Sequence, residues 1–189
     1  MMRPLNSIVV AVLLALAGCA AVPGLHDPAR TNQAVSLVNM LSWTNAVSDK
    51  PDALRTAWPL AALTQHTEQF PLTQVKQCDA AGVCKWGVLK AQRMLSAPRY
   101  VAGGVAVDLA LSIDVGRAGD ALQGGETVAL AIPADVQALE GKRTVRKPLV
   151  LPYGKVERID LGFGIAYDLC AQRLNAAGQP VDSCDIPYL

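Results

Sequence analysis

Few side chains in this sequence are suited to catalysis, and the cysteines are the most informative. The chain of 189 residues contains five cysteines and only two histidines, His26 and His66. Neither histidine has a second histidine three or four residues away, as a helix-borne zinc motif requires. A glycine-flanked nucleophilic serine and a glycine-rich phosphate loop are also missing. We therefore expect no metal site, no cofactor and no catalytic residue, and we expect a protein that is not an enzyme.

Carboxylates deserve separate attention, because glycoside hydrolases work with pairs of them. Asp108 and Asp114 share one face of a predicted strand, and Asp160 and Asp168 share one face of a later strand. If the two strands are neighbours, the four side chains form a cluster typical of an envelope hydrolase. The alternative, which we favour, is the solvated face of a half-exposed sheet. An inhibitor of such a hydrolase would instead present an ordered loop.

The N-terminus has the pattern of an export signal. Arg3 precedes an apolar run over residues 8–17, which is too short for a membrane span of about 20 residues. Leu16-Ala17-Gly18-Cys19 ends this run and resembles the lipobox of bacterial lipoproteins. The resemblance implies removal of residues 1–18 and acylation of Cys19. Ala20 in place of an aspartate implies, by the same resemblance, sorting to the outer membrane. A plain secretory leader with a chance cysteine is the alternative.

The other four cysteines are predicted to form disulfides, because an exported chain meets an oxidising compartment. Asp79-Ala80-Ala81-Gly82 and Asn175-Ala176-Ala177-Gly178 are both typical of a type I turn followed by a glycine bulge. Counting outward from these turns places Cys78 opposite Cys84 and Cys170 opposite Cys184. Both pairs fall on non-hydrogen-bonded sites, where facing Cα atoms are about 4.5 Å apart. A redox pair or a zinc site is the less favoured alternative.

Two regions follow the leader and a short tether over residues 19–27. Residues 28–66 are predicted to be helical, with Asp27 as the N-cap, Pro28 in the first turn and an apolar row at helical spacing. Pro59 is expected to kink or split this segment. The helix is expected to pack on both sides against the fold, or else to keep one face for a partner.

Residues 67–189 are predicted to be strands with close turns. Alternation of apolar and polar residues is strongest over residues 101–115, and residues 159–169 alternate in the same way. An antiparallel β-sandwich, immunoglobulin-like or similar, fits this pattern best. The rival is one curved sheet with the N-terminal helices packed across it.

One stretch of the predicted sheet region is rich in basic residues. A patch that could bind lipid phosphates or an acidic protein partner is expected there, with ordinary solvated edge protection as the favoured alternative. Its members are Lys142, Arg143, Arg146, Lys147, Lys155 and Arg158.

Composition narrows the function classes. Hydrophobic residues make up 51% of the chain, so it is too apolar to be disordered throughout. The net charge of +1 becomes zero when Arg3 is removed, since 17 − 1 basic residues then balance 16 acidic ones. This balance argues against nucleic-acid binding. We expect an outer-membrane lipoprotein on the periplasmic side, held by its N-terminal lipid, that binds an envelope protein partner without a small-molecule cofactor.

Overall fold

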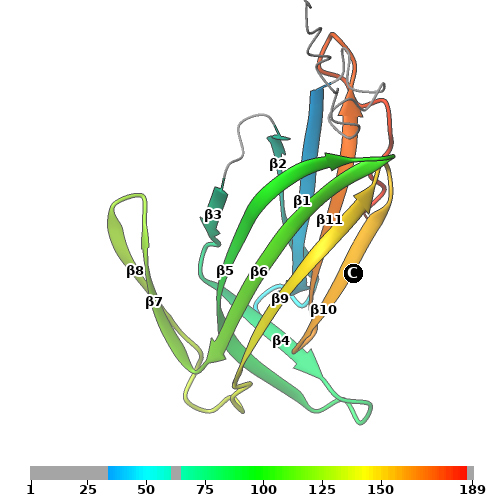
Figure 1. Cartoon of the computed structure of the whole chain (residues 1–189). Helices are drawn as coiled ribbons and strands as arrows, with labels where there is room; N and C mark the ends of the chain where they lie inside the picture. The colour runs from blue at the N-terminus through cyan, green and yellow to red at the C-terminus, as the bar shows by residue number, and fades with distance from the viewer. Residues whose placement is uncertain (1–33, 61–64, 187–189) are drawn as a thin grey trace, which may run out of the picture.

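The computed structural model describes residues 34–60 and 65–186 of the chain. These residues form antiparallel strands in two facing sheets and one separate hairpin, without an α-helix in the described ranges (Figure 1). The strands are β1 (Ala34–Thr44), β2 (Pro51–Pro59), β3 (Gln65–Gln69), β4 (Thr73–Cys78), β5 (Cys84–Val101), β6 (Gly104–Gly116), β7 (Ala118–Gln123), β8 (Glu126–Ala131), β9 (Gly141–Pro152), β10 (Val156–Gly162) and β11 (Ile165–Leu174).

The two large sheets face each other across one apolar core. Sheet A has the strand order β10-β11-β1-β2, and sheet B has the order β3-β5-β6-β9, with β4 also paired to β5. Alternate residues of each strand point into the core, as in Leu109, Leu111 and Ile113 of β6. Leu37 and Leu169 meet them from sheet A. The expected antiparallel sandwich is therefore confirmed.

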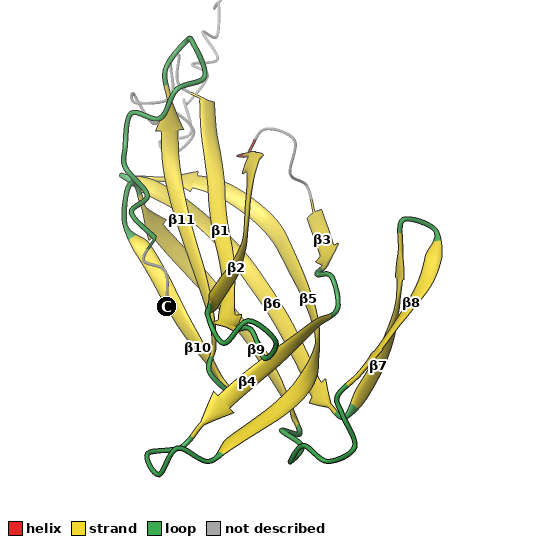
Figure 2. Ribbon diagram, turned by 180° about the vertical axis from the view of Figure 1, so that it is seen from behind, coloured by secondary structure: helices red, strands yellow, loops and turns green. Residues whose placement is uncertain are grey.

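The two long sides of the sandwich are built differently. On one side β9 runs directly into β10, so a short turn joins the edge strands of sheets B and A (Figure 1). On the other side the edge strands are β2 of sheet A and, in succession, β3 and β4 of sheet B (Figure 2). Strands β3 and β4 both pair with β5, β3 with its Gln92–Ser96 part and β4 with its Cys84–Leu89 part. The link Phe70-Pro71-Leu72 separates them, because proline cannot donate a ladder hydrogen bond.

The β7–β8 hairpin stands out from the body of the sandwich (Figures 1 and 2). Its base is held by a second apolar cluster in which Ala121 and Ile132 pack with Leu72 and Val88. Val88 belongs to the outer face of sheet B, so the hairpin covers the end of that face and leaves the rest open.

The helix expected over residues 28–66 is wrong wherever the structure describes it, because residues 34–44, 51–59 and 65–69 are strands. Residues 28–33 and 61–64 lie outside the described residues. In β1 both faces are buried: Leu37 and Leu41 point into the core, while Val38 and Met40 point to the other side. A strand buried on both faces is a nearly continuous apolar run, which also fits helical spacing.

The long strand expected over residues 159–169 is in fact a hairpin. Strands β10 and β11 pair antiparallel, with Gly162 opposite Ile165. Phe163 and Gly164 form the two-residue turn with φ of 56° and 68°, the left-handed values that a type I′ turn requires. The alternation therefore continues through two strands rather than one.

Both predicted disulfides are confirmed, Cys78–Cys84 and Cys170–Cys184. Both turns also have the expected form: Asp79 N–H donates to Val83 O, and Asn175 N–H donates to Gln179 O. The Cys78–Cys84 pair lies within the β4–β5 ladder, with the Cα atoms 3.9 Å apart.

The Cys170–Cys184 disulfide does not lie within a β-ladder, unlike the first one. The chain after the Asn175–Gly178 turn pairs with β11 only as far as the bridge between Leu174 and Pro180. It cannot pair further, because β10 occupies the same edge of β11, with Val156 opposite Cys170. The C-terminal segment instead lies against the outer face of sheet A, where Cys184 and Ile186 pack on Val38 and Met40.

Candidate functional site

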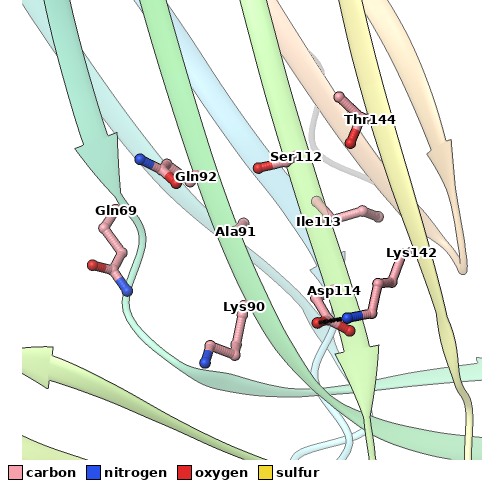
Figure 3. A pocket seen from close by; sticks show the side chains of 9 residues that line it. All are labelled: Gln69, Lys90, Ala91, Gln92, Ser112, Ile113, Asp114, Lys142 and Thr144. Carbon is pink, nitrogen blue, oxygen red and sulfur yellow. Dashed lines mark ion pairs between the residues drawn. The ribbon is translucent and has the colours of Figure 1, made fainter.

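The outer face of sheet B carries a continuous row of polar side chains on neighbouring strands. Ser112 of β6 lies between Gln92 of β5 and Thr144 of β9, and Asp114 lies in the same way between Lys90 and Lys142. We call this surface the polar face, and Figure 3 shows its centre. Its members are Thr67, Gln69, Lys90, Gln92, Ser112, Asp114, Lys142, Thr144 and Arg146.

The polar face is hollowed in two adjoining places. A depression of about 290 Å³ is lined by residues of β3, β5, β6 and β9 around Ser112 and Asp114 (Figure 3). A second of about 180 Å³ continues toward Met94 and Arg146. The sheet positions these side chains, because alternate residues of a strand point to the same face. The inward neighbours Leu111 and Ile113 are anchored in the core.

Charge on the polar face is only partly compensated. Asp114 Oδ2 forms an ion pair with Lys142 Nζ at 2.8 Å. Lys90 Nζ lies 3.9 Å from Asp120 Oδ1 of the β7–β8 hairpin. Amide, hydroxyl and ammonium groups dominate the remainder. This arrangement offers hydrogen bonds and a small positive excess, which suits contact with a polar or acidic surface rather than acid–base catalysis.

A buried charged cluster lies between the two sheets on the β2–β3 side. The Arg93 side chain is fully buried and forms an ion pair with Glu68 Oε2 at 2.8 Å. Its Nη1 donates to Asn39 Oδ1 at 3.2 Å, and Asn39 Nδ2 in turn donates to Thr56 of β2. The sequence does signal this cluster: Arg93 occupies an inward position in the series Leu89, Ala91, Arg93, Leu95.

Aromatic rings enclose this cluster. The guanidinium carbon of Arg93 lies 3.8 Å from the centre of the Trp58 ring, and His66 lies 4.7 Å from Trp58 between ring centres. Tyr167 is buried beside Arg93, and burial raises the pKa of its hydroxyl although the Arg93 charge opposes the shift. Removal from solvent strengthens each of these interactions, so the cluster ties the edge strands β2 and β3 to the core.

The four aspartates do not form one cleft. Asp108 and Asp114 point outward from sheet B, whereas Asp160 and Asp168 point outward from sheet A, on the opposite side of the sandwich. Asp168 is fully buried and lies 3.5 Å from Arg158 Nη1. Burial raises the pKa of the Asp168 carboxyl, and Arg158 opposes the shift.

The six basic residues are divided between surfaces. Lys142 and Arg146 belong to the polar face. Arg143 and Lys147 have the opposite parity on β9, and Lys147 pairs with Glu157 of β10 at 2.7 Å. Lys155 lies in the β9–β10 turn, and Arg158 lies on sheet A with Asp168.

Cys19 and His26 lie outside the described residues. Among residues 34–60 and 65–186, no three His, Cys, Asp or Glu side chains converge as metal ligands would. The same part of the chain contains no helix with the length and apolar character needed to cross a bilayer.

No family model matches the chain, and neither a curated protein nor a solved structure shows significant similarity.

Proposed function

We propose that the protein is a lipid-anchored lipoprotein of the outer membrane that acts on the periplasmic side as a binding or assembly module. The polar face of sheet B is its contact surface, and an envelope protein is its partner. The observation that carries this proposal is the polar face itself, a hollowed surface on the rigid strands β5, β6 and β9.

The chemistry of the polar face favours a folded or extended protein segment with acidic groups. Lys90, Lys142 and Arg146 outnumber Asp114 on it, while Gln92, Ser112 and Thr144 supply donors and acceptors between the charges. Interfaces of this kind combine hydrogen bonds with electrostatic complementarity, which directs the partner's orientation. The two disulfides suit the oxidising periplasm, and the lipobox resemblance at Cys19 accounts for the anchor.

The anchor is tested by expressing the full chain in an enterobacterial host. We expect the mature protein to begin at Cys19, to carry a diacylglyceryl group by mass spectrometry, and to fractionate with the outer membrane. Cys19→Ser should abolish the added mass and release the protein from membranes. An unmodified wild-type chain that retains residues 1–18, or begins elsewhere, would refute the anchor.

The contact surface is tested by affinity capture from solubilised envelopes. Ser112→Arg puts a bulky charge at the centre of the polar face, and Ala57→Arg is a matched control on exposed β2, on the outer side of sheet A. We expect the wild type and A57R to retain the same partner, and S112R to lose at least nine-tenths of it. Equal retention by all three proteins would rule out the polar face as the contact surface.

A further inference from the structure

The β7–β8 hairpin is a two-stranded ribbon that reaches beyond the sandwich (Figures 1 and 2). Ala121 and Ile132 hold its base against the body, whereas Leu122 near its tip is 67% exposed. Within residues 34–60 and 65–186 no third strand pairs with it. An isolated pair of strands is only marginally stable in water, and a stable sheet needs three or more strands. The hairpin therefore has the properties of an incomplete sheet.

The turn of the hairpin decides which backbone groups point outward. Gly124 and Gly125 form a two-residue turn with φ of 58° and 90°, as in a type I′ turn, so the pair that closes it is hydrogen-bonded. Hydrogen-bonded and non-hydrogen-bonded pairs alternate along an antiparallel ladder. Thr127, Ala129 and Ala131 consequently direct their N–H and C=O groups away from β7, to the outer edge of β8.

The outer edge of β8 is not protected against pairing. Soluble proteins usually guard a free edge with a lysine, a proline or a bulge. Residues 127–131 contain no charge and no proline, and their register with β7 is continuous. Gln74 Nε2 donates to Ala131 O at 2.8 Å, which leaves the second lone pair of that oxygen for another donor. β8 is also the strand of the hairpin farther from the sandwich in both views, so an added strand has room (Figures 1 and 2).

A second copy of β8 fits this edge in a register centred on Ala129. When two β8 strands pair antiparallel about a twofold axis, Ala129 faces Ala129 of the second copy, and Thr127 faces Ala131. These positions carry the outward backbone groups, so each facing pair exchanges two hydrogen bonds. Val128 then faces Leu130 of the second copy as an apolar cross-strand pair. The strand is thus complementary to itself.

Charges at the ends of the strand favour the same arrangement. Arg117 is fixed just beyond β8, because its Nη1 donates to Pro133 O at 3.1 Å and its Nη2 donates to Val136 O at 2.9 Å. In the antiparallel pair Glu126 faces Ile132 of the second copy, next to Pro133 and therefore beside the Arg117 of that copy. Opposite charges meet at both ends of the paired strands, which directs their orientation. A parallel pairing would instead bring two Glu126 carboxylates together.

We infer that β8 is a dimerisation strand, through which two copies of the chain join their hairpins into one four-stranded antiparallel sheet. Antiparallel pairing places the two sandwiches at opposite ends of this sheet, because each hairpin stands out from its own body (Figure 1). The contact uses the same strand of both copies, so it closes at two. It is separate from the polar face, and either proposal can fail without the other.

Cross-links from this edge differ from those of the polar face. Thr127 faces Ala131 of the second copy, so a photoreactive group at Thr127 joins two copies of the chain and gives a product of twice its mass. A product with another envelope protein is expected only from the polar face.

The register is tested by cysteine cross-linking of the full chain in intact cells. Ala129→Cys brings two cysteines to facing positions, whose Cα atoms are about 5.5 Å apart and within the range of a disulfide. The matched control Thr127→Cys leaves its two cysteines offset by four residues, about 14 Å apart. After mild oxidation we expect A129C to form a product of twice the chain mass on a non-reducing gel, and T127C to remain single. Absence of the A129C dimer, a product of A129C with a different protein, or an equal dimer with T127C would overturn the proposal.

Two proline variants test the edge itself. Ala129→Pro removes an outward N–H from β8, whereas Asp120→Pro removes one from the β7 edge, because Asp120 faces Ala129 within the hairpin. Light scattering on the full chain purified in detergent measures the dimer. We expect the wild type and D120P to dimerise alike, and A129P to dimerise at least about tenfold more weakly. A monomeric wild type, or a loss of the dimer in D120P but not in A129P, would contradict the assignment to β8.

Discussion

Arg93 of sheet B lies over the indole ring of Trp58 of sheet A, with 3.8 Å between the guanidinium carbon and the ring centre. This contact joins a fully buried cation to the edge strand β2, and Glu68 joins the same cation to the edge strand β3. One side chain therefore ties the edge strands β2 and β3 to the core.

The Arg93–Glu68 pair is expected to be essential for stability. Glu68→Gln leaves the Arg93 charge buried without its counter-ion, and breaking a buried pair costs about 3–5 kcal/mol. We expect the free energy of unfolding to fall by about 3 kcal/mol, measured by urea denaturation. Glu126→Gln on the exposed hairpin is the matched control, with an expected change within about 0.5 kcal/mol. Equal effects of the two substitutions would show that the buried pair contributes nothing.

The two disulfides should contribute unequally. The chain-entropy model gives about 2.4 kcal/mol for the shorter Cys78–Cys84 loop and about 3 kcal/mol for the Cys170–Cys184 loop. Cys170 is also fully buried, and its bond holds the C-terminal segment on sheet A. Replacing Cys170 and Cys184 by alanine should therefore lower the midpoint of thermal unfolding more than replacing Cys78 and Cys84. The reverse order would contradict this account of the C-terminal segment.

Two aspartates should make opposite contributions to the pH dependence of stability. Hydrogen bonding to Arg173 lowers the pKa of Asp182 below 3.8, so its contribution is present above that pH and is lost as the pH falls through the lowered pKa. Burial raises the pKa of Asp168, so its contribution is greatest at low pH and is lost as the pH rises from 3.8 through the raised pKa.

Asparagine variants measure these two terms. The unfolding free energy of the wild type minus that of Asp182→Asn should increase with pH, and the corresponding difference for Asp168→Asn should decrease. Denaturant titrations between about pH 2.5 and pH 7 provide both slopes. Slopes of the same sign would contradict the environments described for these carboxyls.

Gly87 on β5 should not tolerate a side chain. A Cβ there would lie 2.6 Å from the carbonyl oxygen of Leu139 and closer still to the Val115 side chain. Gly87→Ala should cost about 1–3 kcal/mol, because overpacking a filled core forces the backbone to move. Gly116→Ala is the control, since its Cβ would approach only Ala118 O, at 3.8 Å. Equal unfolding free energies for the two variants would refute the close approach of Leu139 to β5.

The strand pairs around local turns were predictable from the sequence, whereas the pairing of distant strands was not. Cys78 and Cys84 face each other because the Asp79–Gly82 turn sets the register within a few residues. The spacing of apolar residues in β1 indicates a helix, because its pairing with β11 and β2 depends on residues far along the chain that the local pattern does not contain. The pairing also buries both its faces and hides the period of two.

The candidate site was predictable only in part. The alternation of Ser112 and Asp114 indicates a polar face, but the sequence does not show that β5 and β9 flank it. Asp108 and Asp114 do not meet Asp160 and Asp168, because β6 belongs to sheet B whereas β10 and β11 belong to sheet A. Arg93 stands at a core position of β5, and its partners Glu68 and Asn39 come from two other strands whose pairing was unknown.

The most direct test of the account is site-specific photo-cross-linking in intact cells. A photoreactive amino acid is placed at Ser112 on the polar face, and at Thr127 on the exposed hairpin as a control. We predict that the Ser112 position forms a discrete cross-link to one envelope protein, that the Thr127 position does not, and that Cys19→Ser diminishes the product. A cross-linking pattern identical at both positions, or no product at Ser112, would contradict the claim that the polar face is the contact surface of a membrane-anchored binding module.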